Sequence, residues 1–170
     1  MNKWIWYGLG AIALLNIAAG RREADDWRYL SAHCNNNYRS TAGTTHFTLS
    51  EFHSKNGVDV PFAYRGNVQA VMIELEKARR WIRTNIKTDA VIILNSGYRS
   101  PDHNRNEGGE PNSQHLCGTA ADVRVPGLSG WQLNQLFEEM INRGIIRNGG
   151  LGRYSNRVHY DIGPVRRWVG

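Results

Sequence analysis

The feature that most constrains the fold is the stretch SQHLCGTAADV, residues 113–123. It places His115 seven residues before Asp122, with a glycine and small alanines between them. Gly118 permits a tight turn, and the alanines take little space where the chain folds back on itself. The imidazole before the turn and the carboxylate after it can therefore reach one point, and a further histidine, His159, follows in the later segment RVHYDIG.

These three side chains have the composition of a hydrolytic metal site. Zinc in such a site takes three protein ligands and leaves one position open for water. His115, Asp122 and His159 supply that number if the strands that carry them are neighbours. Asp161 follows His159 by two residues, so both side chains project from the same face of a strand. The spacing alone leaves ordinary surface or core histidines as the alternative.

The composition indicates a soluble globular domain. The chain has 170 residues, of which 41% are hydrophobic and 21% charged, and this length corresponds to about one domain. The net charge of +6 favours an acidic partner such as nucleic acid, a membrane surface or an anionic wall polymer. The basic residues come as scattered pairs without a nucleic-acid module signature, so we expect no nucleic-acid binding. The sequence does not predict an oligomeric state.

The amino-terminal segment differs from the rest of the chain. Residues 4–20 follow a lysine and are apolar except for one asparagine, a pattern typical of an export signal. We expect residues 1–22 to be a signal peptide or a retained membrane anchor, with a buried helix as the alternative. Residues 23–45 are polar and lack a period, which predicts a linker or peripheral arm, and residues 46–170 form the domain. We therefore expect export to the periplasm or cell envelope.

The remaining patterns predict an α+β fold. A capping box at Thr48 and Glu51 predicts a short helix that ends near Gly57. The later elements, in chain order, are a helix over 67–85, a buried strand within 90–100, a loop over 101–113, a strand from 120, a helix from 129 to 143 and a hairpin within 149–163. This order predicts a single α+β domain in which helices flank a small mixed or antiparallel sheet.

The two cysteines permit one disulfide at most. Cys34 and Cys117 lie far apart in the sequence, and no CxxC pair is present, so a zinc ribbon is excluded. Their pairing depends on a distance that the sequence does not give, and a small buried hydrophobic residue is the alternative for each.

Three blocks of the sequence carry a family resemblance. SGYRSPDHN (96–104), GGEPNSQHLCGTAADV (108–123) and GGLGRYSNRVHYDIG (149–163) are similar, in the same order, to the signature blocks of the M15 family of zinc peptidases. This family comprises D-alanyl-D-alanine carboxypeptidases and peptidoglycan endopeptidases, including phage endolysins. The resemblance implies a fold like that of hedgehog and D-Ala-D-Ala peptidases, Zn²⁺ as cofactor, and cleavage of amide bonds in peptidoglycan stem peptides or crosslinks by carboxypeptidase or endopeptidase action.

The resemblance also implies roles for individual residues. It places the zinc ligands at His115, Asp122 and His159. Arg99 matches the family arginine that contacts substrate and stabilises the developing oxyanion, a role that its fixed charge suits. Further residues that the resemblance or the pattern places near substrate are Ser113, His103, Asn104 and Tyr98, and other aromatic candidates for the cleft are Tyr154, Tyr160 and Trp168, with core packing as their alternative.

One departure from the family pattern affects the proton acceptor. Several branches carry an acidic residue three positions before the last histidine ligand, where this chain has Asn156. Asp161 then becomes the leading general base, with a supporting role beside His159 as the alternative. A non-catalytic, zinc-stabilised binding module of the same fold is the alternative function. For the metal site, the alternative to three protein ligands is a fourth ligand at Cys117.

Overall fold

The computed structural model describes Cys34, Tyr38 and residues 43–170. The expected signal peptide or anchor at 1–22 and most of the expected linker at 23–45 lie outside the described residues. Within the described part, none of the helices combines the length and apolar character needed to span a membrane. The chain divides into two units, residues 1–34 and 35–170, and the second unit carries every element described below.

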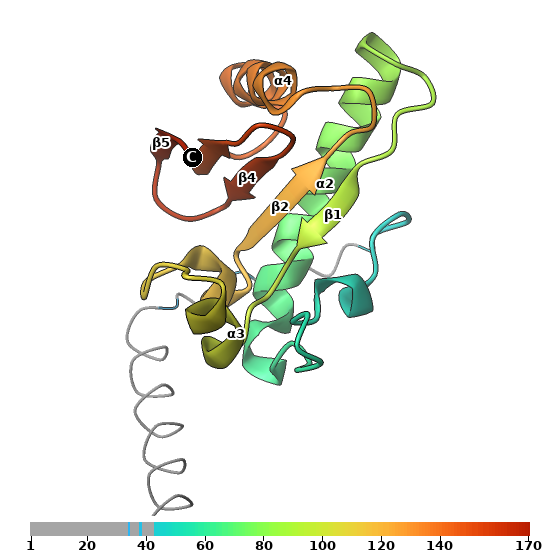
Figure 1. Cartoon of the computed structure of the whole chain (residues 1–170). Helices are drawn as coiled ribbons and strands as arrows, with labels where there is room; N and C mark the ends of the chain where they lie inside the picture. The colour runs from blue at the N-terminus through green and yellow to red at the C-terminus, as the bar shows by residue number, and fades with distance from the viewer. Residues whose placement is uncertain (1–33, 35–37, 39–42) are drawn as a thin grey trace, which may run out of the picture. The chain divides into compact units, whose positions relative to one another are not determined.

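A five-stranded sheet forms the centre of the domain (Figure 1). Its strand order is β1-β2-β4-β3-β5, and all neighbouring strands are antiparallel except β3 and β5, which are parallel. The strands are β1 (Ile93–Ser96), β2 (Ala120–Arg124), β3 (Gly150–Arg153), β4 (Val158–Asp161) and β5 (Arg166–Val169). The predicted α+β class and mixed sheet are therefore confirmed.

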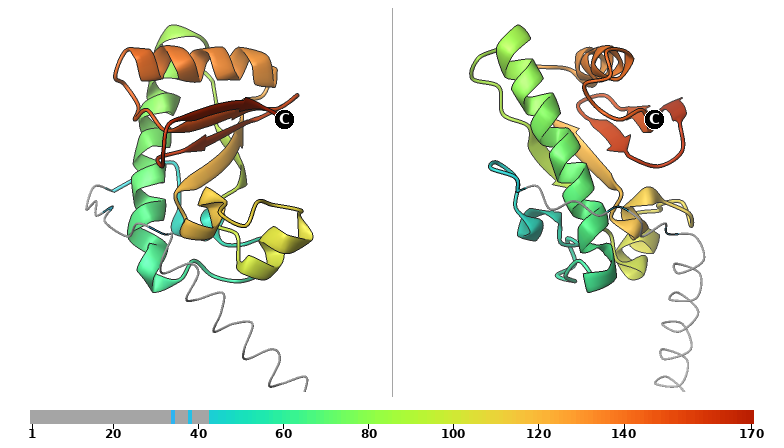
Figure 2. Two further views of the ribbon diagram at one scale, coloured as in Figure 1. Left: turned by 90° about the vertical axis from the view of Figure 1, so that its left-hand side faces the viewer. Right: turned by 180° about the vertical axis from the view of Figure 1, so that it is seen from behind.

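Two helices pack on the sheet and build the core. They are α2 (Arg65–Asn85) and α4 (Gly130–Asn142), which contact and cross each other (Figure 2). The apolar residues of α2 recur at threes and fours, and those that face the sheet are buried. The start of α4 is fixed by the predicted capping box, in which the Ser129 hydroxyl accepts from the Gln132 amide and the Gln132 side chain accepts from the Ser129 amide. The ring of Phe137 on α4 lies 5.5 Å from that of Tyr160 on β4, so Tyr160 is a core residue.

Alternation along the strands sends a second set of side chains to the opposite face. Val158 and Tyr160 of β4 point to the helices, so His159 and Asp161 point the other way. The register pairs Asp122 of β2 with His159, and pairs His159 in turn with Gly152 of β3. Trp168 of β5 pairs with Gly152 on its other side. We call this surface, with Asp122, His159, Asp161, Arg166 and Trp168 on it, the site face.

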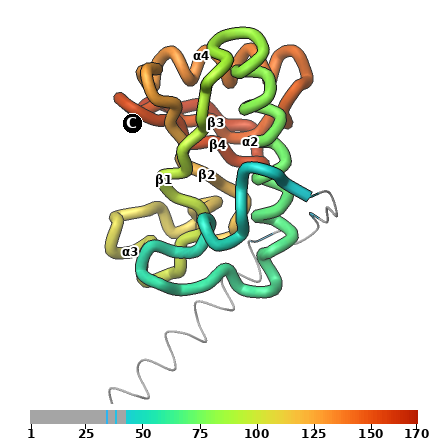
Figure 3. Tube along the Cα trace, turned by 90° about the vertical axis from the view of Figure 1, so that its right-hand side faces the viewer, coloured from blue at the N-terminus to red at the C-terminus, as the bar shows by residue number. Residues whose placement is uncertain are grey.

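The segment before α2 supports the end of β1. It contains the short 3-10 helices η1 (Leu49–Phe52) and η2 (Phe62–Tyr64), and it passes beside the start of α2 (Figure 3). The Tyr98 amide donates to the Phe52 carbonyl at 2.9 Å. The predicted capping box of Thr48 and Glu51 is present, but the helix ends at Phe52 instead of near Gly57, because His53 already has an extended ψ of 150°.

Two further elements differ from what the sequence indicated. Residues 101–106 form the helix α3 (Pro101–Asn106) where a loop was expected. Ser100 caps this helix by accepting from the His103 amide, and Pro101 takes the first helical position, where its missing N–H costs nothing. Strand β5 was not predicted at all. It is short, and its exposed residues pair in parallel with β3, which no local pattern announces.

Candidate metal centre

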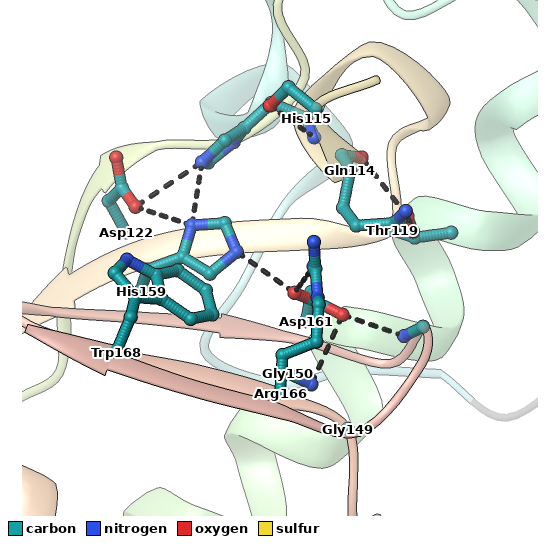
Figure 4. Close-up of polar contacts among 12 residues, drawn as sticks. Gln114, His115, Thr119, Asp122, Gly149, Gly150, His159, Asp161, Arg166 and Trp168 are labelled. Atoms are coloured by element: carbon teal, nitrogen blue, oxygen red, sulfur yellow. Dashed lines mark hydrogen bonds and ion pairs between the residues drawn. The ribbon is translucent and has the colours of Figure 1, made fainter. Parts of the chain in front are cut away.

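Three side chains from separate parts of the chain converge on the site face (Figure 4). His115 lies on the 3-10 helix η3 (Gln114–Cys117), Asp122 on β2 and His159 on β4. His115 Nε2 lies 3.2 Å from Asp122 Oδ1 and 3.1 Å from His159 Nδ1, and His159 Nδ1 lies 3.0 Å from the same carboxylate oxygen. All three residues are buried. We call them the His-Asp-His cluster.

The outer nitrogen of each imidazole has a partner that can only accept a hydrogen bond. His115 Nδ1 lies 2.6 Å from the Gly97 carbonyl oxygen, and His159 Nε2 lies 3.1 Å from Asp161 Oδ2. Because a carbonyl or a carboxylate cannot donate, the proton of each neutral ring is assigned to this outer nitrogen. The inner nitrogens, His115 Nε2 and His159 Nδ1, then direct lone pairs into the cluster.

Two nitrogen lone pairs and one carboxylate oxygen thus meet within hydrogen-bonding distance, with few protons to share. Such an arrangement repels itself unless a cation lies among the three atoms. The donor atoms lie within 4.8 Å of one another and match the nitrogen and oxygen ligands of a catalytic zinc site. The cluster can therefore hold a divalent metal ion.

The pKa values within the cluster follow from burial and from these contacts. Burial lowers the pKa of His115, despite the opposing hydrogen bond to Asp122. Burial works against the charged forms of Asp122 and His159, but their hydrogen bonds outweigh it. These bonds lower the pKa of Asp122 and raise that of His159. Asp122 is consequently a carboxylate at neutral pH, as a metal ligand must be.

Asp161 lies behind His159, away from the other two members of the cluster. Its side chain is fully buried, and both oxygens are occupied. Oδ1 accepts from the Gly150 amide at 3.2 Å and the Gly163 amide at 2.9 Å, while Oδ2 accepts from His159 and, at 2.6 Å, from Arg166. A side-chain carbon at Gly150 would overlap this carboxylate, so glycine is required there.

Arg99 reaches the cluster from the end of β1. Its guanidinium donates to Asp122 Oδ2 at 2.8 Å and to the Ser96 hydroxyl at 3.0 Å, and its amide donates to the His115 carbonyl at 3.1 Å. The guanidinium thus holds the carboxylate oxygen that the two imidazoles leave free. Arg99 also lines the open cavity above the cluster.

The other expected substrate residues differ in position. Ser113 lines the cavity and caps η3 by accepting from the His115 amide. Tyr98 is buried against Tyr64, with ring centroids 6.2 Å apart, and its burial raises its pKa to about 12. His103 and Asn104 lie on α3, where the Asn104 amide group donates to the Glu110 carbonyl and supports the following loop. These last three residues are not among those that line the cavity.

The cavity has a volume of about 570 Å³, and the cluster forms part of its surface. One side is built by strands and their connection, with Tyr154, Arg157, Arg166 and Trp168. The opposite side is the loop over 107–113, which includes two glutamates, Glu107 and Glu110. Neither Arg157 nor Arg166 was predicted as a site residue. The period of two in Arg166 and Trp168 is the signal that could have placed both on one face of a strand.

Neither cysteine is free, because Cys34 and Cys117 are both disulfide-bonded. Cys117 consequently offers no thiolate to a metal ion, and the alternative of a fourth cysteine ligand is wrong.

Comparison with known proteins identifies the family. The model of the peptidase M15 family matches residues 45–161 of the chain. The chain belongs to the peptidase M15 family. It is therefore an enzyme of the peptidase class, as the resemblance implied, and its matched region contains all three members of the His-Asp-His cluster.

Individual relatives give a narrower comparison. The chain is 37% identical over 97 residues to the probable peptidoglycan L,D-endopeptidase MepK of Haemophilus influenzae. The aligned region covers 52% of the chain and 49% of that relative. It is 29% identical over 148 residues to the peptidoglycan L,D-endopeptidase MepK of Escherichia coli K12. Here the aligned region covers 71% of the chain and 78% of that relative. The chain thus spans about half of the first relative and most of the second.

Proposed function

We propose that this protein is a zinc-dependent endopeptidase that cleaves amide bonds in peptidoglycan crosslinks. The observation that carries the proposal is the convergence of His115 Nε2, His159 Nδ1 and Asp122 Oδ1 on the surface of an open cavity. The names of the two MepK relatives support peptidoglycan as substrate and endopeptidase action over carboxypeptidase action. The expected export of the chain through residues 1–22 would bring it to such a substrate.

In this proposal the zinc ligands are His115, Asp122 and His159. When bound, zinc supplies Lewis acidity, which polarises a carbonyl oxygen and lowers the pKa of water to about 7. The protein holds both imidazoles in the required tautomer through Gly97 and Asp161. Burial of the three ligands excludes competing water from their outer sides.

Arg99 and Asp161 then have different roles. Arg99 keeps a fixed positive charge at the cavity surface, where it stabilises negative charge that develops on the scissile carbonyl oxygen. Asp161 has no contact with the cavity, and four donors already surround its oxygens. We therefore favour the positioning role for Asp161 over that of general base: it fixes the His159 tautomer.

Purified full-length protein incubated with crosslinked cell-wall fragments tests the proposal by mass analysis of the products. We expect crosslinked dimers to separate into monomers, the reaction to stop with a chelator and to resume with added Zn²⁺. Release of single D-alanine without dimer separation would indicate a carboxypeptidase instead. Unchanged fragments from several wall types would favour the non-catalytic binding module.

A further inference from the structure

The strand side of the cavity carries a row of two aromatic rings with an arginine at each end. The row consists of Arg166, Trp168, Tyr154 and Arg157, and we call it the cationic wall. The Arg166 guanidinium lies 5.4 Å from the Trp168 ring centroid, and the Trp168 indole N–H donates to the Tyr154 hydroxyl at 3.3 Å. The Arg157 guanidinium lies 4.3 Å from the Tyr154 ring centroid. Each member therefore contacts the next, and all four line the cavity.

The wall is anchored to the His-Asp-His cluster through Trp168. The indole lies 5.1 Å from the His159 imidazole, measured between ring centroids, and it occupies the space above Gly152. A side-chain carbon at Gly152 would overlap the indole, so the glycine of β3 lets a tryptophan from β5 reach a histidine on β4. The wall therefore has a fixed position relative to the cluster.

Arg157 differs from the other two arginines that line the cavity. Arg99 donates to Asp122, and Arg166 donates to Asp161, so both guanidinium groups are partly neutralised. Among the described residues, Arg157 has no carboxylate partner, and its guanidinium stacks on the Tyr154 ring. Stacking uses the face of the guanidinium and leaves its N–H donors at the edge available for a planar anion.

The opposite side of the cavity has the reverse charge. The loop over 107–113 contributes Glu107 and Glu110, which are exposed. A peptide with a free carboxylate is attracted to the cationic wall and repelled by this loop, so the charge difference orients it in the cavity. The wall extends from His159 across two aromatic rings to Arg157, which places the cation away from the scissile amide.

We propose that Arg157, held on Tyr154, binds a free carboxylate of the substrate peptide and so restricts this enzyme to anionic stem peptides. The inference rests on the proposed function for the identity of the peptide. Its chemistry is that of a bidentate pair between a guanidinium and a carboxylate. Arg157 is thus a specificity-determining residue that acts outside the metal centre.

Calorimetric binding of two synthetic crosslinked stem peptides tests the inference. One peptide has free carboxylates and the other has them amidated, and both carry a reduced, non-hydrolysable bond in place of the scissile amide, so that the zinc-loaded protein binds them without turnover. We expect Arg157→Gln to raise the Kd of the free-acid peptide about tenfold and Arg157→Lys to restore part of the loss. Arg153→Gln is the matched control, because it removes the same charge from the same hairpin at a residue outside this cavity. Its Kd should stay within about twofold of wild type.

The amidated peptide completes the test. It should bind wild type about as weakly as the free-acid peptide binds Arg157→Gln, and the substitution should not weaken it further. Equal loss for both peptides, or no loss for either, would overturn the inference. Hydrolysis by the zinc-loaded wild type is measured separately. Binding that depends on Arg157 without hydrolysis would support this site while contradicting the proposed peptidase function.

Discussion

The strand side and the loop side of the cavity are built differently. On the strand side, Asp122 and His159 line the cavity, and Asp161 lies behind His159. All three are buried, and each is held by several polar contacts in addition to the register of the sheet. On the loop side, Glu107 and Glu110 are exposed and belong to a segment with few regular elements. This fold therefore places its reactive groups where the backbone fixes them. The contacts that can adjust to a ligand are made by a loop. Substitutions on the strand side should therefore reduce metal binding and activity far more than substitutions on the loop side.

The largest effect is expected for His159→Ala. The substitution removes one of three converging donors and the ring that packs on Trp168. Zinc affinity and turnover should each fall by about 10³-fold or more, since a three-ligand site with two ligands left loses its geometry. Metal titration and product analysis measure the two losses. Near-normal turnover with bound zinc would place the catalytic centre elsewhere.

A smaller loss is expected for Asp161→Asn. An amide group beside His159 Nε2 can donate to it, which moves the ring proton to Nδ1 and removes the lone pair from the cluster. Zinc affinity should fall about 10- to 100-fold. Asp102→Asn is the matched control, because it makes the same change at an exposed carboxylate on α3. If Asp161→Asn binds zinc normally but has no activity, Asp161 acts as the general base after all.

Gly152→Ala tests whether empty space on β3 holds the cationic wall in place. The added methyl group overlaps the Trp168 indole, which must move away from His159. We expect a loss of about 1–3 kcal/mol in the free energy of unfolding and a several-fold rise in KM. Gly43→Ala is the control, because nothing lies within 4 Å of a side chain there. Thermal unfolding and steady-state kinetics give both values, and an unchanged variant would show that the indole has no fixed position.

The smallest effect is expected for Glu110→Gln on the loop side. The side chain is exposed, so stability should stay within about 0.5 kcal/mol of wild type. Loss of one repulsive charge should lower the KM for an anionic peptide by only about two- to threefold, and this decrease should vanish at high salt. A loss as large as that of Asp161→Asn would erase the contrast between the two sides.

The sequence predicted the parts of this site that have local signals. The spacing of His115 and Asp122 around Gly118 indicated that both could reach one point, and the period of two indicated that His159 and Asp161 share a strand face. The structure has both arrangements, and it pairs Asp122 with His159. Trp168 was named as a candidate for the cleft and does line the cavity, but the strand that carries it and Arg166 was not predicted. Arg166 and Trp168 reach the site face only because β5 pairs in parallel with β3, a contact that no short pattern specifies.

Residues 101–106 show a different error, in which a local signal was present but was not used. Pro101–Asn106 contains turn formers, and this composition led to the prediction of a loop. The same residues also carry a serine cap followed by proline and aspartate, which is a helix start, and the local cap decided the structure. Burial of Tyr98 is a tertiary result, because the sequence did not reveal that Phe52 of η1 and Tyr64 of η2 would lie against it.

Strand β3 contributes no functional atom to the centre beyond its backbone, yet its two glycines decide which other side chains can meet above it. An engineer who transplanted this centre to another sheet by copying its acids, bases and aromatic rings would therefore fail. The transplanted sheet must also have the two glycines of β3, and a comparison that considers only side chains does not detect them.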